Sequence, residues 1–84
     1  MTTTRTAGEL LGDHVRDLRQ KRGLTQNDLA QRLGVPQSRI SEIESGTRVP
    51  NLATMLRLAA ALECKPTALL TPFDKLDART FLRK

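Results

Sequence analysis

The sequence predicts an all-α protein, built as a bundle of five short helices. Its length of 84 residues fits one small domain with a modest core. The hydrophobic fraction of 38% contains no tryptophan or tyrosine, which favours compact packing of aliphatic helices. Apolar residues also recur at helical spacing in five segments bounded by glycine, proline or capping residues, and no strand is expected before residue 73.

The first helix is expected from Glu9 to Arg22. Leu11, Val15 and Leu18 recur at i, i+4 and i+7 and so form one apolar stripe on the core side of a helix. Gly23 then closes the helix. Residues 1–8 are expected to form a flexible N-terminal segment that precedes a domain spanning residues 9–71.

The second helix carries its own start and stop signals. Thr25 stands at the N-cap and Asp28 follows three residues later, so the hydroxyl and the carboxylate can satisfy free backbone amides as a capping box. Leu29 and Leu33, four residues apart, continue one apolar stripe. Gly34 ends the helix because glycine takes the left-handed conformation without a steric cost.

The third helix follows this turn at once. Pro36 can open it, since the N–H that proline lacks would have no helical partner there, and Ile40 and Ile43 face the core. Its other side is polar, with Gln37 near the N-terminus followed by Ser38, Arg39, Ser41, Glu42 and Ser45. Two short helices hinged on one glycine are typical of a helix-turn-helix, and these side chains can reach base edges. The alternative is an ordinary solvated helix face.

Two further helices are expected to support this motif. Asn51 is a good N-cap for a fourth helix, whose inward face should comprise Leu52, Met55, Leu56, Ala59 and Leu62. Pro66 can start a short fifth helix that holds Leu69 and Leu70, and Pro72 is expected to end it. Residues 72–84 form a C-terminal tail and a candidate dimerisation element.

The charge of the chain favours a polyanionic partner. Fourteen basic residues against nine acidic ones give a net charge of +5 and a sequence pI near 10.4. Seven of the basic residues lie between Arg16 and Arg48, around the proposed motif, and the tail adds Lys75, Arg79, Arg83 and Lys84. This distribution is the one expected for contacts with DNA phosphates. Solubility alone, or an acidic protein partner, are the alternatives.

Other classes of function find little support in the sequence. No run of about 18 apolar residues exists and the N-terminus lacks an apolar signal core, so a cytoplasmic protein without a membrane span is expected. Cys64 cannot form an internal disulfide, and with His14 as the one histidine no metal site or cofactor is expected. We interpret Cys64 as a small buried side chain and His14 as solvated. No catalytic constellation is present, so the chain is not expected to be an enzyme.

From Val15 to Leu70 the chain resembles the Cro and phage-repressor (Xre) type of helix-turn-helix. The residues that carry the resemblance are Arg16, Arg19, Gly23, Leu24, Thr25, Gln26, Leu29, Ala30, Gly34, Val35, Ile40, Ser41, Glu44, Gly46, Pro50 and Leu62. The resemblance implies a five-helix bundle that binds double-stranded DNA as a homodimer. The second and third helices would form the helix-turn-helix, with the third helix in the major groove.

The resemblance also implies roles for individual residues. Gln26, with Thr25 beside it, would hold a DNA phosphate, and Arg19 and Glu44 would form a structural pair between the first and third helices. Base edges would be read by Gln37, Ser38, Arg39 and Glu42, and phosphates would also be contacted by Ser41, Ser45, Thr47 and Arg48. Glu42 could instead form a surface pair with Arg39.

Two positions depart from the family pattern. Pro36 replaces the usual serine or threonine N-cap, and Glu63 stands where glycine commonly ends the fourth helix. A residue other than glycine in the left-handed region costs about 1 kcal/mol. The fourth helix is therefore expected to end one residue away, or without that geometry.

The tail lies beyond the resemblance. Phe73 and Leu76 could continue a helical contact, whereas Ala78 to Leu82 could form a strand across a dimer interface, and the sequence does not choose between them. Exposing the two phenylalanines on a monomer would be costly. The candidate dimer contacts are therefore Leu69, Leu70, Phe73, Leu76 and Phe81, and a frayed basic tail is the alternative.

The function expected from all of these features is that of a homodimeric transcription regulator, most simply a repressor, on a palindromic operator. An antitoxin with a cognate toxin as partner and a restriction–modification controller would use the same domain. A protein-interaction adaptor without sequence-specific DNA binding is the alternative from another class.

Overall fold

Four α-helices and two 3₁₀ helices account for most of the computed structural model, which describes residues 5–82. In chain order they are α1 (Ala7–Lys21), α2 (Gln26–Leu33), α3 (Gln37–Ser45), α4 (Leu52–Ala61), η1 (Pro66–Phe73) and η2 (Ala78–Leu82). No strand occurs within this range, so the all-α fold class is confirmed. The five helices expected from the sequence correspond to α1–α4 and η1, and residues 1–4 of the expected flexible segment lie outside the described range.

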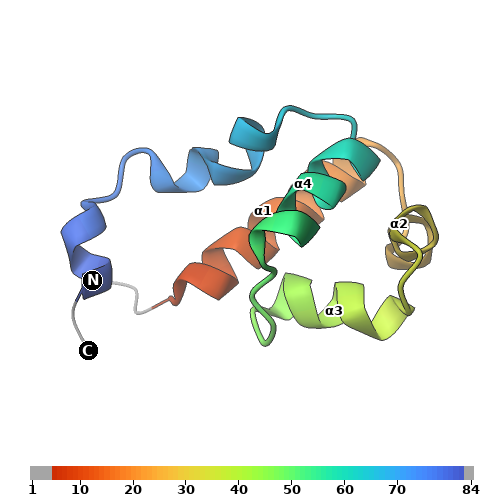
Figure 1. Ribbon diagram of the computed structural model, residues 1–84, viewed down its shortest axis with the longest axis horizontal. Helices are drawn as coiled ribbons and strands as arrows, with labels where there is room; N and C mark the ends of the chain where they lie inside the picture. Colours follow the sequence, from red (N-terminus) through yellow and green to blue (C-terminus); the bar gives the residue numbers. More distant parts are fainter. Residues whose placement is uncertain (1–4, 83–84) are drawn as a thin grey trace.

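The elements pack around one aliphatic core. α1 contacts α3 and η1, while α2 contacts α3 and α4, so the helix-turn-helix of α2 and α3 is held from two sides (Figure 1). Every element except η2 contributes to the buried core of Leu11, Val15, Leu29, Ala30, Leu33, Ile40, Ile43, Leu58, Ala59, Leu62 and Leu69. The inward positions expected in α1, α2 and α3 are confirmed, with Leu18 of α1 only partly buried against the core.

The helix α1 starts two residues earlier than the sequence analysis expected. Thr6 is its N-cap, and the Thr6 hydroxyl accepts from the amide of Glu9 at 3.1 Å while the Glu9 carboxylate accepts from the amide of Thr6 at 2.8 Å. This capping box fixes the start at Ala7, before the apolar stripe begins. The matching capping box of Thr25 and Asp28 at α2 is confirmed.

The inward face of α4 differs from the expected one. Leu58, Ala59 and Leu62 are buried, whereas Leu52 and Leu56 are 74% and 48% exposed. Because α4 is apolar on nearly every side, periodicity did not identify the side that faces the core. Leu52 and Leu56 of α4 and Val49 in the loop before it are exposed, and we call these three residues the α4 stripe.

The end of α4 keeps left-handed geometry without a glycine, contrary to expectation. Glu63 has φ 56°, and the amide of Cys64 bonds to the carbonyl of Ala59 at 2.9 Å. Two arginines bind around this turn. Arg22 donates to the carbonyl of Glu63 at 2.7 Å, and Arg32 donates to the carbonyl of Ala61 at 2.8 Å. Cations at a helix C-terminus are favourable and offset the backbone strain.

The segment after α4 is a 3₁₀ helix rather than an α-helix, and Pro72 lies inside it instead of ending it. Pro72 has no N–H, so one i→i+3 hydrogen bond of this helix is missing at that residue. His14 joins η1 to α1, because its Nε2 lies 2.6 Å from the carbonyl oxygen of Ala68 and 3.2 Å from the hydroxyl of Thr71. The expectation that His14 is solvated was therefore wrong.

Two glycines of α1 permit its close contact with α3, and the sequence analysis missed both. A Cβ at Gly12 would lie 2.4 Å from the carbonyl oxygens of Ile43 and Glu44, and one at Gly8 would lie 2.9 Å from that of Gly46. These neighbours are backbone atoms and cannot move aside alone. The spacing of four residues places both glycines on the same face of α1.

We predict that Gly12→Ala destabilises the fold by about 1–3 kcal/mol, because the new methyl group forces α1 and α3 apart. At a helix position with open space around it, replacing glycine by alanine would stabilise the fold by about 1 kcal/mol. The sign of the change in the free energy of unfolding therefore distinguishes a close contact from open space. Urea denaturation measures the change, with Gln20→Ala on the exposed side of α1 as the control. A Gly12→Ala variant as stable as the wild type would contradict the close packing.

Candidate nucleic-acid interface

The helix α3 presents one polar side to solvent and one side to the core. Gln37, Ser38, Ser41 and Ser45 are exposed, and Arg39 and Glu42 are half-buried. Ile40, Ile43 and Glu44 are buried on the other side. The helix begins at Gln37 with Pro36 as its N-cap, and Pro36 supplies no side-chain capping bond. The expected separation of a polar side from a core side therefore holds in the structure.

A buried ion pair fixes α3 to α1. Arg19 donates through Nε and Nη2 to the two carboxylate oxygens of Glu44, at 2.6 and 3.0 Å. Arg19 Nη1 also donates to the carbonyl of Leu24 at 2.8 Å, in the link between α1 and α2. Glu44 is 1% exposed and Arg19 8%. A two-point contact of this kind sets both the distance and the orientation of the two helices.

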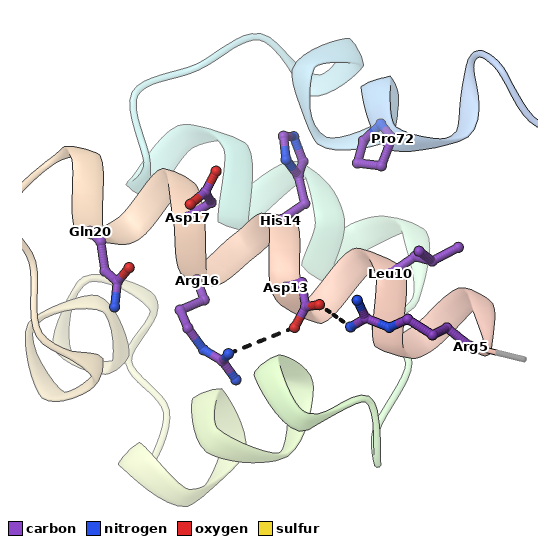
Figure 2. A pocket seen from close by; sticks show the side chains of 8 residues that line it. All are labelled: Arg5, Leu10, Asp13, His14, Arg16, Asp17, Gln20 and Pro72. Carbon is purple, nitrogen blue, oxygen red and sulfur yellow. Dashed lines mark hydrogen bonds and ion pairs between the residues drawn. The ribbon is translucent and has the colours of Figure 1, made fainter. Parts of the chain in front are cut away.

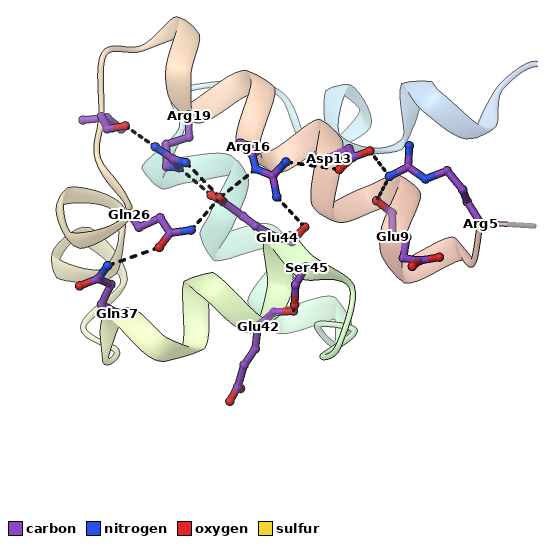
Figure 3. A network of polar contacts seen from close by, with 11 residues as sticks. Arg5, Glu9, Asp13, Arg16, Arg19, Gln26, Gln37, Glu42, Glu44 and Ser45 are labelled. Atoms are coloured by element: carbon purple, nitrogen blue, oxygen red, sulfur yellow. Dashed lines mark hydrogen bonds and ion pairs between the residues drawn. The ribbon is translucent and has the colours of Figure 1, made fainter. Parts of the chain in front are cut away.

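Arg16 adds a second cation beside Glu44. Its Nε lies 3.5 Å from the Glu44 carboxylate, and its Nη2 donates to the Glu44 carbonyl at 3.4 Å. Arg16 also pairs with Asp13, which in turn binds Arg5 (Figure 3). Glu44 therefore collects contacts from both arginines, Arg16 and Arg19, on one side of α1.

The pKa of Glu44 reflects these contacts. Burial by itself would raise the pKa, but hydrogen bonds from Arg19 and Gln26 and the charges of Arg19 and Arg16 outweigh it, so the pKa lies below its ordinary value of 4.5. The hydrogen bond to Glu44 also raises the pKa of Arg19. Both groups stay charged at neutral pH as a result.

Gln26 connects the first turn of α2 with both ends of α3. Its amide nitrogen donates to Glu44 at 3.1 Å, and its amide oxygen accepts from Gln37 at 3.3 Å (Figure 3). The sequence predicts that Gln26 anchors a phosphate and that Gln37 reads a base. The structure brings these two side chains into direct contact, which spacing along the chain did not indicate. Thr25, beside Gln26, is exposed and caps α2.

The turn after α3 is held by Glu42. The hydroxyl of Ser45 donates to the carbonyl of Glu42 at 3.1 Å and lies 2.9 Å from the hydroxyl of Thr47. The Glu42 carboxylate accepts from Nε of Arg48 at 2.8 Å. Within residues 5–82 the ion pair of Glu42 is thus made with Arg48 and not with Arg39, so the alternative Arg39 pairing was wrong.

Some of the residues expected at a dimer interface make contacts within the chain instead. Leu69 is fully buried in the core, which removes it from the candidates for contact with a second subunit. Phe73 and Phe81 pack edge to face on one another, with ring centroids 6.3 Å apart. Residues 78–82 form the 3₁₀ helix η2 and not the strand considered for them, while Leu76 lies in the bend between η1 and η2 and does not continue a helix. Leu70, Leu76 and Phe81 remain 49%, 42% and 47% exposed.

The surface of the described chain carries several hollows. One hollow of about 530 Å³ lies between α1 and η1, where Asp17 and His14 point away from α3 and Pro72 of η1 faces α1 (Figure 2). Another of about 310 Å³ is lined by the apolar residues Ala7, Leu70, Phe73, Ala78 and Phe81. Across the described part of the chain, no cluster of histidine, cysteine or acidic residues is arranged to hold a metal ion. Cys64 is partly buried against the core, and burial raises the pKa of its thiol.

No helix of the described chain is long and apolar enough to cross a membrane.

The arrangement of α2, the turn at Gly34 and α3 defines the class of domain. An exposed polar helix, preceded by a short capped helix and a glycine turn, is the arrangement of a helix-turn-helix DNA-binding domain. The family model for the helix-turn-helix family HTH_3 matches residues 15–69. The chain therefore belongs to the Xre/Cro-like helix-turn-helix family of DNA-binding transcriptional regulators, and the resemblance noted in the sequence is confirmed.

Relatives and solved structures agree with this assignment. An uncharacterized HTH-type transcriptional regulator of Sinorhizobium fredii, y4dJ, is 37% identical over 67 residues, covering 80% of this chain and 87% of the relative. The transcriptional repressor RghR of Bacillus subtilis is 48% identical over 56 residues, which cover 66% of this chain but only 42% of RghR.

Among solved structures, the restriction–modification controller C.AhdI of Aeromonas hydrophila has a TM-score of 0.72 and 35% identity, covering 74% of this chain and 94% of the controller. The P22 c2 repressor in complex with a synthetic operator has a TM-score of 0.67 and 34% identity, with the same coverage of 74% and 94%.

We predict that Glu44→Gln lowers the stability of the fold at pH 7 by about 3 kcal/mol, because it leaves the buried Arg19 without a charged partner. The pH dependence supplies a second readout. Since the pKa of Glu44 is lowered in the folded state, its contribution is fully present above pH 4.5 and is lost as the pH falls through the folded-state pKa. Urea denaturation between pH 7 and pH 3 measures both effects.

The control is Glu63→Gln, which neutralises an exposed carboxylate and should cost less than about 1 kcal/mol. An acid-induced loss of stability as steep in Glu44→Gln as in the wild type would contradict the assignment to Glu44.

Proposed function

We propose that this regulator is a sequence-specific repressor that binds a palindromic operator as a homodimer. The observation that carries the proposal is the exposed polar side of α3, which is braced from behind by the contact of Glu44 with Arg19. A helix held at two points loses little further entropy when it enters the major groove. The similarity to a P22 repressor solved with its operator supports this choice.

Two groups of residues would divide the work on DNA. Gln37, Ser38 and Arg39 lie in the first turn of α3, where side chains can reach base edges. Thr25 and Gln26 at the start of α2, with Ser41, Ser45, Thr47 and Arg48, would bind phosphates and set the register. The net charge of +5 would add affinity for any DNA sequence.

A homodimer would supply the length of the binding site. One helix reads only a few base pairs, whereas two helices about 34 Å apart read both halves of a palindrome. Leu70 of η1 and Leu76 and Phe81 of the tail are exposed apolar residues and would form the interface. As a DNA-bound regulator the protein would act in the cytoplasm.

A restriction–modification controller is the second candidate function. The observation that favours it is the similarity to C.AhdI, which aligns over 94% of that controller. The two candidates use the same chemistry on DNA and differ in the genes that flank the operator. Mapping the selected operator on the genome would separate them, since a controller site lies beside restriction and modification genes.

The proposal predicts that an inverted repeat emerges when the protein selects DNA from a random pool. Selection at two salt concentrations distinguishes specific from electrostatic binding, because phosphate contacts weaken steeply with salt. A pool that stays featureless, with binding that collapses at the higher salt concentration, would reject sequence-specific recognition and would favour a role as an adaptor.

Substitutions in the two groups should have different effects. Arg39→Ala is expected to relax base preference at one position of each half-site, at a cost of about 1–3 kcal/mol on the operator and little on random DNA. Gln26→Ala is expected to weaken binding to all sequences to a similar extent. Equal losses on operator and random duplexes for Arg39→Ala would reject its role as a base reader.

Dimer contacts can be assigned by charge substitution. Phe81→Asp and Leu76→Asp should each yield monomers in sedimentation equilibrium, because a carboxylate in an apolar interface is costly. Leu52→Asp in the α4 stripe is the control, since Leu52 is exposed and apolar but lies outside the tail. If Leu52→Asp were monomeric and both tail variants remained dimeric, the dimer interface would lie at α4 and not at the tail.

A further inference from the structure

Glu42 is the one acidic side chain on the exposed side of α3, because the other glutamate of this helix, Glu44, is buried. Figure 3 shows the side chain of Glu42 directed away from the polar network around Glu44. In the proposed complex this carboxylate would face DNA. An acidic group there lowers affinity for phosphates unless it is neutralised or meets a cytosine amine.

Besides the backbone hydrogen bonds within α3, Glu42 makes its contacts with the turn that follows this helix. Its carboxylate accepts from Nε of Arg48 at 2.8 Å, and its backbone carbonyl accepts from the amide of Arg48 at 3.1 Å. The hydroxyl of Ser45 donates to the same carbonyl at 3.1 Å. Glu42 therefore holds Arg48 at two separate points, one on the main chain and one on the side chain.

This arrangement leaves a specific part of Arg48 available. With Nε bound to Glu42, the terminal nitrogens Nη1 and Nη2 carry the remaining N–H donors of the guanidinium group. The Arg48 side chain is 49% exposed, so these donors can meet solvent or a ligand. A free arginine loses much rotamer entropy when it binds a phosphate, and an arginine that is already oriented loses less.

We propose that Glu42 is a positioning residue, which orients Arg48 for a DNA phosphate beside the turn after α3, and that it does not read a base. This inference rests on the proposed function, since it assumes that α3 and this turn meet DNA. It assigns the acidic residue a favourable effect on binding, whereas its charge alone would have an unfavourable one.

Two substitutions isolate the positioning effect. Glu42→Gln and Glu42→Ala both remove the charge, but glutamine keeps an oxygen that accepts from Nε of Arg48 and alanine does not. Each is made alone and in an Arg48→Ala background, and binding is measured on the selected operator and on a random duplex. Asp17→Asn, on the side of α1 away from α3, reports the effect of losing one distant negative charge (Figure 2).

The expected result is that Glu42→Ala binds both DNAs about fivefold more weakly than Glu42→Gln, which is the upper range for an exposed ion pair. In the Arg48→Ala background the two variants should bind equally, because the group that Glu42 positions is absent. Asp17→Asn should bind slightly more tightly than the wild type, since it loses a negative charge.

Three results would overturn the proposal. Equal affinities of Glu42→Ala and Glu42→Gln would show that the acceptor for Arg48 has no effect. A change of the selected base from cytosine to adenine in Glu42→Gln would show that the residue reads a base. A fivefold difference that persists without Arg48 would reveal a general effect on the fold. A wild-type protein that binds no DNA would instead reject the proposed function itself.

Discussion

The buried pair of Arg19 and Glu44 is the interaction on which the rest of the structure depends. Two charges removed from water are tolerated only when their hydrogen bonds are satisfied, and here the carboxylate binds Arg19 at two points and Gln26 at a third. Any displacement of α3 along or away from α1 would leave a buried charge unpaired. Gly12 allows this geometry, because it lets the backbones of α1 and α3 approach closely. The orientation of α3 is therefore fixed by contacts on its buried side, which faces α1.

The other side of the helix-turn-helix is fixed by two arginines, one in α2 and one in α4, each of which binds the C-terminal end of the other helix. Arg32 of α2 donates to the carbonyl of Ala61 at the end of α4, and Arg57 of α4 donates to the carbonyl of Leu33 at the end of α2. Each helix thus receives a cation at its negative end. The left-handed Glu63 is tolerated at the same place, since Arg22 and Arg32 both bind around that turn.

Local signals in the sequence predicted most of the fold, and contacts between distant residues account for what was missed. Thr25, Asp28 and Gly34 determine α2 through neighbouring backbone groups, so they could be recognised from the sequence. The capping box of Thr6 was local too, but it precedes the first apolar stripe. The partner of Glu42, the role of Gly12 and the contact of His14 with η1 depend on how elements pack, and the exposed side of α4 was ambiguous because nearly all of that helix is apolar.

A double-mutant cycle on Arg19 and Glu44 tests the central claim most directly. The free energy of unfolding would be measured for Arg19→Met, Glu44→Leu and the double variant. If the pair braces α3, each single variant loses about 3–5 kcal/mol, and the double variant loses far less than their sum, because no buried charge is left unpaired. Additive losses in the double variant would contradict the account, since they would mean that the two residues stabilise the fold independently.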